Sequence, residues 1–197
     1  MTLGSDILEM GFTLVHDQGR QAFNAFQPGN TGGKGTGKFS TVELDSEMDY
    51  DAIFSVVKKT VKQVVHRERA GLGLALAELP PTLGAFWEIG GNYIVMNEAL
   101  IGAMTSLARN RTEFNSFIYS VLTHEYLHSV GFIDEGEARI LTAKVAVESF
   151  GEDHPASIIS SAGPWAIYPD LLRVRGGNGS GLKIVSRFDS DSTSYIN

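Results

Sequence analysis

Residues 124–134, HEYLHSVGFID, decide the fold of this chain. His124 and His128 are four residues apart, so their imidazoles project from the same face of a helix and can take neighbouring positions around one zinc ion. Glu125 follows the first histidine directly. It lies close enough to take a proton from a zinc-bound water molecule without itself binding the metal. This arrangement is typical of zinc hydrolases.

The residues after His128 supply a candidate third ligand. Gly131 can adopt the left-handed backbone conformation that ends a helix, which would allow Asp134 to turn back toward the metal. Asp134 is also a good start for the next helix, because Glu137 follows at the spacing of a capping box. A carboxylate has two oxygens, so we predict that Asp134 both binds the metal and starts this helix.

These residues form a motif that is found in a known class of enzymes. The motif HExxHxxGxxD consists of His124, Glu125, His128, Gly131 and Asp134. The segment 93–139 resembles metzincin-type metallopeptidases with aspartate as third ligand, and among these it is most similar to the small, minimal zincins. The resemblance implies a zincin-like α+β fold, a zinc cofactor and a peptide or protein substrate. Metzincins also have a methionine turn after the third ligand, whereas the last methionine here is Met104.

Three alternatives remain open. A gluzincin-like peptidase would keep the same helix and take Glu135, Glu137 or Glu148 as its third ligand. Antiparallel packing of the next helix would bring Glu137 level with His128, whereas Glu148 would lie about three turns further along. A metal-dependent ribonuclease would also use closely spaced histidines. A non-catalytic domain with a structural zinc ion would not need a carboxylate beside its first ligand.

Length and composition indicate one acidic domain. A chain of 197 residues with 43% hydrophobic content can bury a genuine core. Its net charge of −7 argues against a nucleic-acid partner, because binding to phosphates requires a basic surface. The chain has no cysteine, so a metal must be held by histidine and carboxylate side chains.

The predicted location is the cytoplasm. The first residues, MTLGSDILEMGFTLV, have no basic region and carry acidic residues within their apolar stretch, so they do not resemble a signal peptide. No run of apolar residues approaches the 18 or so that a membrane span requires, so we expect no membrane partner. The oligomeric state cannot be predicted from these features.

The pattern of apolar residues predicts a small twisted mixed sheet with a backing helix over 49–69 and a buried active-site helix over 112–130. Among the short strands, Asn92–Met96 is the candidate for an exposed rim strand that pairs with an extended substrate. We expect a single zincin-like domain over residues 1–175. The tail 176–197 is rich in Gly and Ser, and partial disorder is expected there.

Overall fold

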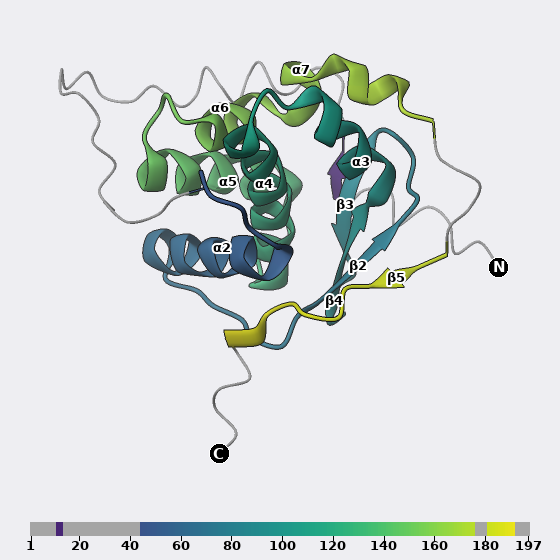
Figure 1. Ribbon diagram of the computed structural model, residues 1–197. Coiled ribbons are helices and arrows are strands. Elements are labelled where there is room, and N and C mark those ends of the chain that lie inside the picture. Colours follow the sequence, from purple (N-terminus) through teal and green to yellow (C-terminus); the bar gives the residue numbers. More distant parts are fainter. Residues whose placement is uncertain (1–10, 14–43, 176–180, 192–197) are drawn as a thin grey trace.

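The computed structural model describes residues 11–13, 44–175 and 181–191. It is an α+β fold, as predicted, with one five-stranded sheet and a group of helices that Figure 1 shows on one side of it. In chain order the elements are β1 (Gly11–Thr13), α2 (Tyr50–Val65), β2 (Gly73–Ala77), β3 (Leu83–Trp87), β4 (Tyr93–Asn97), α3 (Glu98–Leu107), α4 (Arg111–Ser129), α5 (Glu135–Phe150), α6 (Pro155–Ala162), α7 (Pro164–Ile167), the 3-10 helix η2 (Pro169–Arg173) and β5 (Lys183–Ile184). Within the described ranges, no helix is both long enough and apolar enough to cross a membrane.

The sheet is mixed, with the strand order β1-β3-β4-β2-β5. β4 pairs with β2 in parallel, and it pairs with β3 in the antiparallel direction. Both edges of β4 are therefore occupied by neighbouring strands. The prediction that Asn92–Met96 is an exposed rim strand is wrong, because its main-chain groups already bond within the sheet and cannot also pair with a substrate.

Helix α4 lies at the centre of the molecule. It packs against α2, α5 and α6 and against strand β3, and Figure 1 shows it between α2 and the sheet. Its N-cap is Asn110, whose side-chain oxygen accepts a hydrogen bond from the backbone N–H of Glu113 at 2.9 Å. From Asn115 to Ser129 every residue of the helix is buried. The buried helix predicted over 112–130 is confirmed, and side chains on all of its faces are shielded from water.

Helix α2 corresponds to the backing helix predicted over 49–69. Asp49 is its N-cap and accepts a hydrogen bond from the backbone N–H of Ala52 at 2.8 Å. The buried side chains Ile53, Phe54, Val57 and Val61 belong to the core that α4 completes. The helix ends four residues earlier than predicted, because His66 takes the left-handed conformation with φ of 56°.

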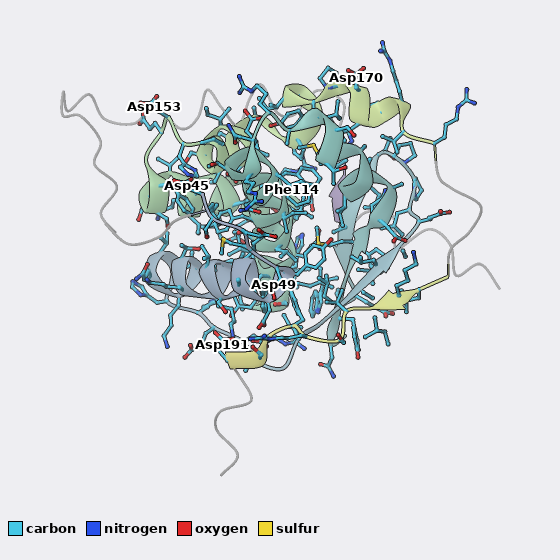
Figure 2. All side chains as sticks on the ribbon, in the orientation of Figure 1. Asp45, Asp49, Phe114, Asp153, Asp170 and Asp191 are labelled. Carbon is cyan, nitrogen blue, oxygen red and sulfur yellow. The ribbon has the colours of Figure 1, made fainter. Side chains whose placement is uncertain are left out.

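The C-terminal segment is part of the domain. β5 pairs with β2, and Asp189, only 2% exposed, accepts hydrogen bonds from the backbone N–H groups of Gly71 (2.7 Å) and Leu72 (3.0 Å). Asp189 also forms an ion pair with Lys58 of α2, which bonds to Asp191 as well at 2.8 Å. Figure 2 shows Asp191 beside α2.

The predicted domain therefore does not end at residue 175, because residues 183–191 contact both α2 and the start of β2. The rest of the predicted tail, residues 176–180 and 192–197, lies outside the described residues.

Replacing Asp189 by alanine should lower the free energy of unfolding by about 2–4 kcal/mol, because the backbone N–H groups of Gly71 and Leu72 lose their acceptor and Lys58 loses its buried partner. Urea unfolding of the two proteins measures this change. Asp191→Asn is the control, because Asp191 bonds the same lysine from a side chain that is 53% exposed. An Asp189→Ala protein within about 0.5 kcal/mol of the parent would contradict the structural role of this segment.

Candidate metal centre

Three side chains converge where α4 meets the start of α5. The Nε2 atoms of His124 and His128 are 3.1 Å apart, and Oε2 of Glu135 lies 3.2 Å from the first and 3.3 Å from the second. Among the described residues, these three form the one group of His and carboxylate side chains whose geometry would suit a metal ion. A tetrahedral zinc site with bonds of about 2.0–2.1 Å has ligand atoms about 3.3 Å apart. The three observed distances match the edges of such a tetrahedron.

A tight turn between the two helices places Glu135 beside the histidines. Gly131, with φ of 105°, follows the last turn of α4, and its backbone N–H bonds to the carbonyl oxygen of His128 at 3.0 Å. The N–H of Phe132 then bonds to the carbonyl oxygen of Leu127 at 3.1 Å. The chain therefore reverses within a few residues, so that the first residue of α5 lies next to His128. Gly131 serves the predicted helix-ending function, but it presents a different carboxylate from the one expected.

Asp134, the predicted third ligand, starts α5 and does not belong to the group of three. Its Oδ1 atom accepts a hydrogen bond from the backbone N–H of Glu137 at 2.8 Å, and its side chain is exposed. An N-cap side chain bends back toward the first amides of its own helix, which turns Asp134 away from the histidines. Of the predicted double role, the structure retains the helix-starting part only.

The structure also distinguishes the other carboxylates considered as third ligand. Glu135 is the one that reaches the histidines. Glu137 is exposed, and Glu148 pairs with Lys144 on the surface of α5 at 3.9 Å. The sequence contains a signal for Glu135. If the side chain of Asp134 caps α5, Glu135 is the next carboxylate in the chain, and it is the one that remains to face α4.

Two hydrogen bonds orient side chains of this group. The Nδ1–H group of His128 donates to the carbonyl oxygen of Phe132 at 2.7 Å, so in the neutral imidazole, the form that binds a metal, the lone pair is on Nε2. Arg139, one turn along α5, donates from Nε to Oε1 of Glu135 at 2.7 Å. Each of these two side chains is thus held by a neighbour on the side away from the shared centre.

Two arginines that follow α2 fasten the end of α4. Arg67 donates to the carbonyl oxygen of Val130 at 3.2 Å, and its guanidinium lies 4.3 Å from the centre of the Phe132 ring. Arg69 donates to the carbonyl oxygen of Ser129 at 3.3 Å. Positive charge at a helix C-terminus is favourable, because the last carbonyl oxygens carry partial negative charge. The turn that leads to Glu135 is therefore fixed from the α2 side as well.

The electrostatics of the site suit a cation. Burial lowers the pKa of His124 to about 4, so its imidazole is neutral near pH 7 and can act as a ligand. Burial alone would raise the pKa of Glu135, but hydrogen bonds to the two histidines and the charge of Arg139 hold this pKa well below its usual value. Glu135 is therefore ionised at neutral pH, and it brings a negative charge to two imidazoles.

Glu125 lies on the same helix as the two histidines and is completely buried, with 0% exposure. Burial by itself would lower the pKa of His128. The hydrogen bond to Glu135 and the negative charge of Glu125 outweigh this effect, and the pKa of His128 is raised above its usual value. Two other described histidines, His66 and His154, cap the ends of α2 and α6 and do not belong to the group of three. Of the three side chains of the group, only that of Glu135 is partly exposed, at 24%.

Comparisons of the chain with models of protein families, with curated proteins and with solved structures found no match. The centre consists of two imidazole nitrogens and one carboxylate oxygen at distances that suit a tetrahedral metal ion, and the buried carboxylate of Glu125 lies on the helix that carries both imidazoles.

Proposed function

We propose that this protein is a zinc-dependent metallopeptidase in which His124, His128 and Glu135 bind the metal and Glu125 is the general base. The observation that carries the proposal is the set of distances of 3.1, 3.2 and 3.3 Å between the three ligand atoms, which a tetrahedral zinc ion requires. The third ligand makes the arrangement gluzincin-like instead of metzincin-like. A cytoplasmic location and a peptide or protein substrate are part of the same proposal.

The donor set favours a catalytic site over a structural one. Structural zinc sites are closed by four protein ligands, whereas catalytic sites use three and leave a position open. Among the described residues the group has three members, and two histidines with one glutamate are a known catalytic combination. When bound, a zinc ion supplies a Lewis acid that lowers the pKa of a coordinated water molecule.

Glu125 is the residue that moves the proton. It follows His124 on a buried helix, so its carboxylate lies within the low-dielectric interior, close enough to His128 for its charge to raise the pKa of that imidazole. A carboxylate there can accept a proton from water as the peptide carbonyl is attacked, and it can return that proton to the leaving amine. A site that only stabilises the fold has no need for this second, non-ligating carboxylate.

The proposal is tested by removing and restoring zinc. Protein treated with a chelator and then dialysed should cleave no member of a mixed peptide library, and one equivalent of zinc should restore cleavage, detected by mass spectrometry. Zinc at about 100 times its dissociation constant should also raise the free energy of unfolding by about 2.7 kcal/mol.

Magnesium is the control, because it prefers oxygen ligands in octahedral geometry. A melting temperature that zinc does not change would overturn the metal site. Zinc binding without any cleavage would overturn the assignment as a peptidase.

A further inference from the structure

The two oxygens of the Glu135 carboxylate face different partners. Oε2 points to the two histidines, at 3.2 and 3.3 Å, and Oε1 accepts a hydrogen bond from Nε of Arg139 at 2.7 Å. Both partners are cationic or hydrogen-bonding groups that prefer the ionised carboxylate. The side chain is therefore held from both sides, and one particular oxygen is presented to the centre.

We propose that Arg139 is a positioning residue that restricts Glu135 to binding the metal through a single oxygen. This inference rests on the metal site proposed above. A carboxylate that uses both oxygens occupies two positions around the ion, whereas a carboxylate that uses one leaves a position for water or substrate. By engaging Oε1, Arg139 keeps that position open.

The contact differs from an ordinary ion pair on a helix surface. The same helix carries a second pair at the same spacing, Lys144 and Glu148, whose nearest atoms are 3.9 Å apart and whose side chains are more than 40% exposed. Arg139 and Glu135 are 2.7 Å apart, with side chains 32% and 24% exposed. Burial strengthens such a contact because water screens it less. The shorter and less exposed pair is the one that includes the proposed ligand.

The nature of the cation also matters. The guanidinium group of arginine is planar and donates in a fixed direction, whereas lysine offers a point charge on a flexible chain. Lysine at position 139 should therefore restore the charge beside Glu135, but not the direction in which the carboxylate is held. This difference separates a positioning role from a simple electrostatic one.

The experiment compares the parent protein with Arg139→Gln, Arg139→Lys and the matched control Lys144→Gln. The affinity for zinc is measured by competition with a chelating dye, and the visible spectrum of the cobalt-loaded protein reports the number of ligands around the metal.

We expect Arg139→Gln to bind zinc about 10–100-fold more weakly, which is the usual effect of removing a partner of a metal ligand. Its cobalt absorption should weaken, as it does when the coordination number rises from four to five. Arg139→Lys should fall between Arg139→Gln and the parent, and Lys144→Gln should match the parent.

The outcomes separate this inference from the proposed function. If the parent protein itself binds no zinc, the metal site is overturned and the role of Arg139 with it. If the parent binds zinc and Arg139→Gln binds it within twofold with the same cobalt spectrum, only the positioning role is overturned. Thermal unfolding without metal checks whether the variants fold. Should Arg139→Gln not fold, Arg139→Lys decides, because a spectrum and an affinity identical to the parent's would overturn the inference.

Discussion

Replacing Glu125 by glutamine should lower kcat for peptide hydrolysis by a factor of about 10²–10⁴ while the protein still binds zinc with nearly the parent's affinity. The amide keeps the size and shape of the side chain, so the completely buried position on α4 can still be filled. An amide cannot accept the proton of the attacking water, however, and the proton can no longer be passed to the leaving amine. Steady-state kinetics on a peptide that the parent cleaves, together with metal analysis of the same samples, measure both quantities.

The matched control for this variant is Glu137→Gln. Glu137 is an exposed carboxylate on α5 that contributes a backbone N–H to the Asp134 cap, and its side chain is not one of the three proposed ligands. Removing its charge should leave both kcat and zinc affinity close to those of the parent. If Glu125→Gln cleaves peptides as fast as the parent, Glu125 is not the base and the mechanism is wrong.

Replacing Glu135 by alanine should weaken zinc binding more than 100-fold. Removing a partner of a metal ligand typically costs about 10–100-fold in affinity, and loss of the ligand itself must cost more. Asp134→Ala should behave differently, although the two residues are neighbours. It removes the acceptor for the N–H of Glu137, so it should lower the free energy of unfolding by about 0.5–2 kcal/mol and leave zinc affinity unchanged.

The two variants are best compared by zinc titration and by urea unfolding in the absence of metal. If affinity collapses in Asp134→Ala and survives in Glu135→Ala, the metzincin-type ligand set predicted from the motif is the correct one. The turn after α4 would then have to differ from the one described, because Asp134 now bonds to the backbone of its own helix.

The parts of the site that lie on one helix could be predicted from the sequence. His124 and His128 are four residues apart, and the helical period alone brings their side chains together, as the 3.1 Å distance between the Nε2 atoms confirms. The burial of that helix was also predictable, since apolar residues cover most of its circumference. Zinc binding and catalysis themselves stay predictions.

The identity of the proposed third ligand depends on a tight turn, where a shift of one residue changes which side chain faces the two histidines. The sequence offered Asp134 and Glu135 side by side, and both are carboxylates. The preference of Asp134 for the cap decides between them, because a capping side chain must point along its own helix. A motif that counts residues from His128 contains no information on this competition.

Contacts between distant segments were beyond prediction for a different reason. β4 is not the exposed edge strand that was predicted, because β2 and β3 pair with it on its two sides. The apolar pattern of one strand does not indicate which other strands become its neighbours. The segment around Asp189 looked like a Gly- and Ser-rich tail. Its attachment depends on hydrogen bonds to Gly71 and Leu72, more than a hundred residues earlier in the chain.

The most direct test of the central claim is anomalous X-ray diffraction from a crystal of the protein grown with zinc, recorded at the zinc absorption edge. We expect a single strong peak per chain, about 2.0–2.2 Å from Nε2 of His124, Nε2 of His128 and one oxygen of Glu135. A peak that lies elsewhere, or one whose third ligand is Asp134, would contradict the metal centre described here.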